Sequence, residues 1–123
     1  MVQGQPNKEQ VMNMIEQTVE IIGDKWSFLI ICEIAFVKSP SRFNEIMKEL
    51  KPISSRTLSI KLSKLADNGI VEKTVEHASP PYTKYSLTEK GKDAVNVLIA
   101  MGEWGFKWLC PDLKQTCGER TGM

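Results

Sequence analysis

The stretch from Pro52 to Gly91 constrains the fold of this chain more than any other part. It contains a short amphipathic helix, a glycine turn, two β-rich segments at 71–75 and 83–87, and the start of another helix. The loop between the β-rich segments holds two adjacent prolines, which lack the N–H that a sheet interior needs. This order of elements predicts a winged helix-turn-helix, a shape that places a helix in the major groove of DNA.

The amphipathic helix has well-defined ends in the sequence. Ser54 is the expected N-cap, and Ile53 and Leu58 lie where a hydrophobic staple forms. Gly69 fits the left-handed position after the helix, with Ile70 packing back as in a Schellman motif. Each end feature contributes about 1 kcal/mol, so together they determine where the helix stops.

The face of this helix opposite its leucines is the expected DNA-reading surface. The N-terminal part of a recognition helix enters the groove. Arg56 offers two parallel donors to guanine, and Ile60 offers an apolar contact to a thymine methyl group. A helix N-terminus, here at Ser54, also favours a phosphate oxygen. The expected base-reading residues are Ser55, Arg56, Ser59 and Ile60, and those suited to phosphate are Thr57, Lys61 and Lys64.

The hairpin and the preceding helix supply further expected DNA contacts. Lys73, His77 and Lys84 are expected to reach the DNA backbone or the minor groove, and Arg42 and Lys48 to steady the backbone. Such phosphate contacts give affinity without sequence information. His77 is the single histidine of the chain, which leaves no second histidine for a metal site or a catalytic triad. A merely solvated His77 at the loop tip is the alternative.

Apolar residues at steps of three and four predict a first helix that ends at Gly23, with either Asn7 or Asn13 as its N-cap. A second, buried helix is expected to begin at Asp24 or Lys25 and to run to about residue 37. Ser41 is expected to cap a short helix through residue 50. Thr88 is expected to cap a long final helix through residue 109, so the fold class is mainly α with a small β-hairpin.

The bulk composition fits one globular domain. The 123 residues are 41% hydrophobic and 25% charged, and no apolar run approaches the roughly 20 residues of a membrane span. The N-terminus lacks a signal pattern, so we expect a cytoplasmic protein without a membrane partner. We expect an N-terminal extension at 1–12, a domain at 13–109 and a tail at 110–123.

Charge is uneven along the chain. Residues 42–92 carry ten Lys/Arg and six Asp/Glu, whereas the flanks carry six and nine. A basic middle between acidic ends suits a DNA-contacting centre with partner-contacting flanks.

Several short segments together carry a family resemblance. In chain order they are Ile22-Gly23-Asp24-Lys25-Trp26, Arg42-Phe43-Asn44-Glu45-Ile46, Ile53-Ser54-Ser55-Arg56-Thr57-Leu58, Leu62-Ser63-Lys64-Leu65, Gly69-Ile70-Val71, Pro81, Tyr85-Ser86-Leu87-Thr88-Glu89-Lys90-Gly91 and Glu103-Trp104-Gly105. Over roughly residues 13–108 the chain resembles the HxlR family of winged-helix transcriptional regulators, which is close to the MarR-type regulators. The resemblance implies a homodimer, built from the first and last helices, that binds a pseudo-palindromic operator as a repressor or activator.

The cysteines depart from part of that family. Many members that sense thiol-reactive compounds carry a Cys-Pro pair just before the first helix, and Asn13 occupies that cysteine position here. We therefore expect no thiol switch of that type. Cys32 is expected to be an inert core thiol. Cys110 and Cys117 lack a zinc-site spacing, so no metal or cofactor is expected, and free thiols or a disulfide within or between subunits remain alternatives.

The residues also support a dimer without the resemblance. Two tryptophans lie one helical turn apart near the end of the last helix, and two glycines beside them allow another backbone to approach. One recognition helix reads too few base pairs for useful specificity, so two-fold pairing is expected. The expected interface consists of Met14, Ile15, Val19, Leu98, Met101, Gly102, Trp104, Gly105 and Trp108.

These patterns favour a dimeric, DNA-binding transcriptional regulator. The alternative is a winged-helix module that binds proteins and has lost DNA binding. An enzyme is not expected, because the sequence holds no nucleophile–base pair, phosphate-binding glycine loop or clustered carboxylates. The expected partners are double-stranded DNA and a second copy of the chain, and a small-molecule effector stays open because no residue pattern names one.

Overall fold

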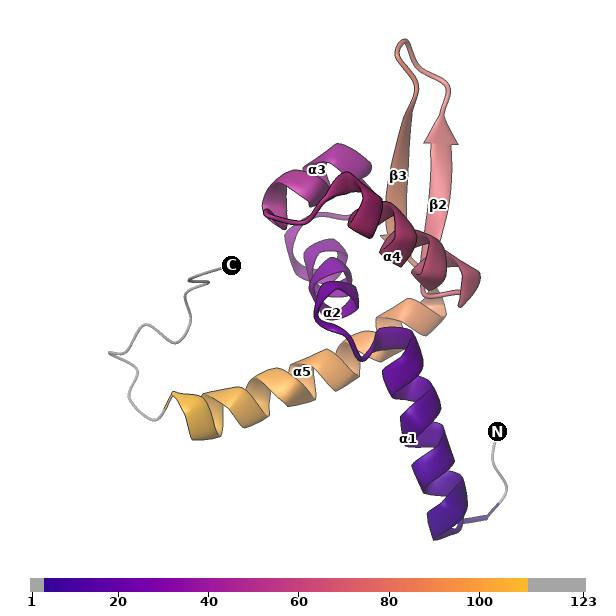
Figure 1. Ribbon diagram of the computed structural model, residues 1–123, viewed down its shortest axis with the longest axis vertical. Coiled ribbons are helices and arrows are strands. Elements are labelled where there is room, and N and C mark those ends of the chain that lie inside the picture. Colours follow the sequence, from indigo (N-terminus) through magenta and orange to yellow (C-terminus); the bar gives the residue numbers. More distant parts are fainter. Residues whose placement is uncertain (1–3, 111–123) are drawn as a thin grey trace.

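The computed structural model describes residues 4–110 as a helical body that carries a small antiparallel sheet (Figure 1). The strand order is β1-β3-β2. This arrangement confirms the predicted winged helix-turn-helix. The elements are α1 (Lys8–Ile22), α2 (Lys25–Cys32), the π-helical turn η1 (Glu33–Val37), β1 (Ser41–Arg42), α3 (Phe43–Glu49), α4 (Ser55–Asp67), β2 (Val71–Glu76), β3 (Tyr82–Leu87) and α5 (Glu89–Leu109).

Helix α4 has the ends that the sequence predicts. The Ser54 hydroxyl accepts a hydrogen bond from the Thr57 N–H at 3.0 Å. At the other end Gly69 has φ +72°, a conformation that favours glycine. The Ile70 N–H then donates to the Leu65 carbonyl at 2.8 Å, as in a Schellman motif. The local chemistry of both caps therefore sets the length of the recognition helix.

Helix α1 begins after Asn7, which decides between the two caps that the sequence allows. The Asn7 side chain accepts from the Gln10 N–H at 2.8 Å, and the Gln10 side chain accepts from the Asn7 N–H at 2.9 Å. This reciprocal capping box satisfies two backbone donors at once. The expected boundary between the N-terminal extension (1–12) and the domain (13–109) consequently falls inside α1. Figure 1 shows α1 extending away from the body, at the opposite end from the hairpin.

The expectation that Ser41 caps a helix is wrong. Ser41 instead lies in β1, where it pairs with Tyr85 of β3, and Arg42 pairs with Lys84. Helix α3 starts only at Phe43, with Arg42 as its N-cap. The two-residue strand satisfies its backbone groups by pairing with β3, a partner more than 40 residues away that no local pattern reveals.

The second helix ends near residue 37 as predicted, but its last turn differs from the α-helical turn expected. The Lys38 N–H donates to the Glu33 carbonyl at 3.1 Å, which closes the wider turn of η1. This turn buries Glu33 and Ile34 and leaves Phe36 and Val37 exposed.

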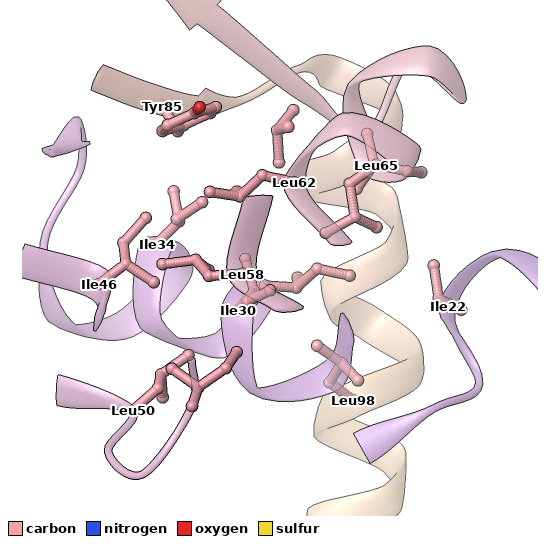
Figure 2. Close-up of a cluster of buried hydrophobic side chains, with 14 residues drawn as sticks. Ile22, Ile30, Ile34, Ile46, Leu50, Leu58, Leu62, Leu65, Tyr85 and Leu98 are labelled. Atoms are coloured by element: carbon pink, nitrogen blue, oxygen red, sulfur yellow. The ribbon is translucent and has the colours of Figure 1, made fainter. Parts of the chain in front are cut away.

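The core holds α4 by its leucine face. Leu58, Leu62 and Leu65 are at most 1% exposed. Complete burial of one such side chain contributes about 2 kcal/mol, so these three leucines attach α4 firmly to the body. Figure 2 shows this cluster of buried side chains, with Ile22, Ile30, Ile34, Ile46, Leu50, Leu58, Leu62, Leu65, Tyr85 and Leu98 labelled.

Helix α5 begins under the turn that follows α4. The Thr88 hydroxyl accepts from the Gly91 N–H at 3.0 Å, as the predicted cap requires. A Cβ at Gly91 would lie 2.1 Å from the Ile70 carbonyl oxygen, so only glycine fits there.

Among the described residues, none of the helices combines the length and the apolar character needed to cross a bilayer.

Two of the three cysteines lie in the described part. Cys32 is partly buried against the core, as expected. Cys110 is buried and disulfide-bonded. Cys117 lies outside the described residues.

Candidate nucleic-acid interface

The outward face of α4 is accessible along its N-terminal half. Ser55, Arg56, Ser59 and Ile60 are all exposed, and the Ile60 side chain is 54% exposed although it is apolar. The hairpin of β2 and β3 projects beyond the helical body close to this helix (Figure 1). The structure therefore places the four expected base-reading residues on one open surface beside a projecting wing.

The first turn of α4 combines a cap with unused donors. Ser54 accepts from the Thr57 N–H and donates its own hydroxyl hydrogen to Thr57 Oγ1 at 3.0 Å. The other N–H groups of a first helical turn have no intrahelical partner, and the helix dipole favours an anion beside them. This end of α4 is thus suited to a phosphate oxygen.

The two lysines of α4 have different surroundings. Lys61 Nζ lies 3.4 Å from Asp24 Oδ2, at the N-terminus of α2. None of the ion pairs found within residues 4–110 includes Lys64 or Arg56. Lys64 therefore keeps its charge for an external anion, whereas that of Lys61 is partly neutralised within the chain.

The base of the wing holds a stacked arginine. The Arg42 guanidinium lies over the Tyr82 ring, 3.8 Å from its centroid. Pairing of β1 with β3 brings these two residues together. Stacking leaves the edge donors of a guanidinium directed outward, which suits two-point contact with a phosphate. The sequence pointed to Arg42 but not to Tyr82 as its support.

The remaining predicted wing residues divide into paired and exposed groups. Lys84 Nζ lies 2.7 Å from Glu76 Oε1. A hydrogen bond from Lys84 holds the pKa of Glu76 below its usual range, and the same bond raises the pKa of Lys84. Lys73 and His77 are exposed. An external phosphate would therefore compete with Glu76 for Lys84, whereas it would meet no such competition at Lys73.

Lys38 joins this region although sequence reasoning did not single it out. A hollow of about 240 Å³ lies between the loop before β1 and the wing, and Lys38, Arg42 and Lys84 line it with Glu45 and Tyr82. Lys38 pairs with Glu45 and holds the pKa of that carboxyl below its usual range. Only the distant β1–β3 pairing places Lys38 beside the wing, so no local signal could have found it.

The residues expected at a dimer interface lie mostly on exposed helix faces. In this group, the side chains of Trp104 and Trp108 are 59% and 63% exposed. Leu98 differs, because it is only 8% exposed and packs in the core of its own chain. The exposed or half-exposed members are Met14, Ile15, Val19, Met101, Gly102, Trp104, Gly105 and Trp108.

An apolar groove of about 490 Å³ runs between α1, α2 and α5. Thr18 supplies the one hydroxyl among its side chains. The groove is lined by Val11, Met14, Ile15, Thr18, Val19, Ile22, Gly23, Phe28, Val97 and Met101. Four of these residues, Met14, Ile15 and Val19 of α1 and Met101 of α5, also belong to the expected dimer interface.

Comparison with known sequences points to one family. The HxlR-like helix-turn-helix family profile matches residues 21–113. The uncharacterized HTH-type transcriptional regulator YybR of Bacillus subtilis is 36% identical over 100 residues, which are 81% of this chain and 77% of YybR. An uncharacterized HTH-type transcriptional regulator of Methanothermobacter thermautotrophicus is 35% identical over 97 residues, covering 79% of this chain and 72% of that protein.

Solved structures agree with the sequence comparison. The redox regulator HypR in its reduced form is similar with a TM-score of 0.70 and 34% identity, over 76% of this chain and 91% of HypR. The reduced form of the transcriptional regulator YodB from B. subtilis is similar with a TM-score of 0.69 and 32% identity, over 80% of this chain and 95% of YodB.

Proposed function

The chain belongs to the HxlR-like helix-turn-helix family of transcriptional regulators, and from this premise we propose that it binds DNA as a homodimer on a pseudo-palindromic operator. One observation carries the proposal. The leucine face of α4 is buried while its Ser-, Arg- and Ile-bearing face is open beside the wing. Reading of the major groove requires a helix with one face packed against the body and the opposite face accessible to DNA.

In this proposal the N-terminal half of α4 reads bases. Arg56 donates to O6 and N7 of a guanine, and Ile60 packs on a thymine methyl group. Ser55 and Ser59 lie on the same accessible surface and suit contacts to neighbouring base edges or to phosphate. The exposure of Ile60 supports this role, since an apolar side chain in the middle of a polar face has no partner within its own core.

The wing and the region beneath it hold the DNA backbone in this proposal. Arg42, oriented by Tyr82, contacts a phosphate through its edge donors. Lys73 and His77 are exposed on the hairpin and approach the backbone or the minor groove. These contacts set register and affinity, whereas the bases read by α4 set the sequence preference.

The second copy of the chain is proposed to cover the apolar faces of α1 and α5. Large apolar residues are exposed along both helices, including Ile15, Val19 and Trp108, and a cluster of exposed apolar side chains is typical of an interaction surface. Two-fold pairing through these helices would place two copies of α4 on successive major grooves, about 34–36 Å apart. The groove between α1, α2 and α5 would then be partly filled by the partner.

Selection of binding sequences from a pool of random duplexes tests the proposal. We expect recovery of an inverted repeat that is bound in a strongly salt-dependent manner. Arg56→Ala should relax the preference at one position of each half-site, whereas Lys64→Ala should weaken binding to all sequences alike. Identical profiles for the two variants would contradict the assignment of α4. A chain that captures proteins but no duplex at low salt would instead be an interaction module.

A further inference from the structure

Asp24 is a rigid acceptor at the joint between α1 and α2. Its Oδ1 accepts from the Ser27 N–H at 2.9 Å, and its Oδ2 accepts from the Ser27 hydroxyl at 2.8 Å. Ser27 is completely buried. A carboxylate held at both oxygens by a buried residue has little freedom to move, so its position is determined by α2.

The joint itself is equally constrained. Gly23 precedes Asp24, and a Cβ at Gly23 would lie 2.5 Å from the Val19 carbonyl oxygen. The backbone of Gly23 therefore lies against the last turn of α1 with no room for a side chain. Because α1 is a proposed dimer helix, Asp24 marks the place where the dimer scaffold meets the DNA-binding body.

Lys61 extends from the middle of α4 to this joint. Its Nζ lies 3.4 Å from Asp24 Oδ2, and its side chain is 25% exposed. At 100° per residue Lys61 lies beside the buried row of Leu58 and Leu65, away from the open face that carries Ile60. The ammonium is thus directed toward Asp24 and not toward the surface that would meet DNA.

Apolar packing and charge pairing constrain a helix differently. The leucine face of α4 provides most of its attachment, and the hydrophobic contribution of that face is non-directional. A charge-assisted contact to a rigid acceptor is directional. A pair as exposed as this one adds little to overall stability, so its effect is expected in orientation.

We propose that Lys61 is a positioning residue, tied to Asp24, that sets the orientation of α4 relative to the dimer joint and contacts no phosphate in the DNA complex. The inference rests on the proposed function and replaces the phosphate role that the sequence suggested for Lys61. Its consequence is that the pair controls how strictly the dimer requires one spacing between half-sites.

The experiment measures fluorescence anisotropy of two labelled duplexes over a range of salt concentrations. One carries the selected inverted repeat, and the other carries the same repeat with one base pair inserted between the half-sites. The variants are Lys61→Met, which keeps an apolar stem, Lys61→Arg, and Asp24→Asn, which remains a good N-cap. Lys64→Met is the matched control on the same helix, and circular dichroism confirms that every variant is folded.

Lys61→Met and Asp24→Asn should each weaken binding to the selected duplex by about 3- to 10-fold and shrink the penalty for the inserted base pair, because the preferred orientation is lost. Their salt slopes should match the unmodified chain, and the double variant should be no worse than either one. Lys61→Arg should restore both affinity and spacing preference. Lys64→Met should instead lower the salt slope by about 0.9 for each phosphate that the variant no longer neutralises.

Two results would overturn the inference while leaving the proposed function intact. A salt slope lowered by Lys61→Met as much as by Lys64→Met would show that Lys61 contacts phosphate. Unchanged affinity and spacing preference in Lys61→Met would show that the pair orients nothing. Failure of the unmodified chain to bind either duplex would overturn the proposed function itself, and the inference with it.

Discussion

The body that runs from α2 to β3 differs from the two long helices α1 and α5 in how completely the apolar residues are buried within one chain. In the body, Leu58, Leu62 and Leu65 of the recognition helix are at most 1% exposed. Along α1 and α5, Val19 and Trp108 are 56% and 63% exposed. The leucines of the recognition helix are thus buried within one chain, whereas many apolar residues of the long helices are exposed on the faces proposed to meet a second copy.

This difference in burial matches the two proposed tasks, which are DNA reading by the body and dimer formation by the long helices. A reading surface must keep its shape before DNA arrives, so its supporting face is buried and its helix ends are capped within the chain. In the proposed dimer, the surface formed by α1 and α5 would be completed only by the second copy, which accounts for the exposure of its residues in the single chain. Substitutions in the two regions should consequently change different observables.

The largest effect is expected from Leu62→Ala in the body. Removal of this buried side chain should lower the free energy of unfolding by about 2–5 kcal/mol through reduced burial and a residual cavity. Ile60→Ala, two residues earlier but 54% exposed, should change it by less than about 0.5 kcal/mol. Urea titrations measure both. Equal losses of stability would show that the two faces of α4 do not differ as described.

A charge on the apolar face of α1 should break the dimer. Ile15→Glu places a carboxylate in the proposed interface and should weaken self-association by about 3 kcal/mol, roughly 100-fold in the dissociation constant. Asn13→Glu adds the same charge to the opposite, polar face and serves as the control. Sedimentation equilibrium measures the association. A dimer that survives Ile15→Glu would exclude this face of α1 from the interface.

Two glycines of α5 should respond in opposite directions to the same change. Gly91→Ala forces a Cβ to within 2.1 Å of the Ile70 carbonyl oxygen, so it should destabilise the chain by about 2 kcal/mol. Gly102 has nothing within 4 Å of a Cβ, so Gly102→Ala should add up to about 1 kcal/mol of helix stability in the single chain. Thermal unfolding at low protein concentration separates these effects. A weaker dimer in Gly102→Ala would place this residue in close contact with the partner, and a stable Gly91→Ala variant would contradict the crowding at the start of α5.

The smallest effect is the acid dependence contributed by Asp24. Burial alone would raise its pKa, but hydrogen bonds from Ser27 and the charge of Lys61 outweigh burial and hold the pKa below 3.8. A carboxyl with a lowered pKa stabilises the folded state above its unfolded pKa, near 4, and this contribution is lost as the pH falls through the folded pKa.

Urea titrations of Asp24→Asn at pH 7 and pH 3 measure this contribution. The variant should be less stable than the unmodified chain by a few tenths of a kcal/mol at pH 7, because solvent screens a side chain that is about one-third exposed. The difference should shrink toward pH 3. A difference that stays constant with pH would assign the loss to the altered hydrogen bonds and not to the charge.

The sequence predicts those parts of the fold that depend on neighbouring residues. Ser54 and Gly69 mark the ends of α4 through local hydrogen bonds, and the structure confirms both. Asn7 and Asn13 both fit a capping pattern, so the pattern could not choose between them. Strand β1 was missed because its two residues gain their hydrogen bonds from β3, far along the chain.

The same contrast between local and long-range contacts decides which parts of the site could be predicted from the sequence. The open face of α4 follows from helical periodicity, so Arg56 and Ile60 were placed from sequence alone. The partners of charged residues do not follow any short pattern. Lys61 meets Asp24 across 37 positions, and Arg42 meets Tyr82 across 40, only because helices and strands pack together.

Hydroxyl-radical footprinting of the selected duplex tests most directly whether two copies of α4 read successive grooves. Two protected regions related by two-fold symmetry, with centres about one helical turn or a multiple of it apart, are expected for the unmodified chain. Ile15→Glu should lose this symmetrical protection at concentrations where Asn13→Glu retains it. A single protected region, or protection that Ile15→Glu leaves unchanged, would contradict the division between a DNA-reading body and a pair of dimer helices.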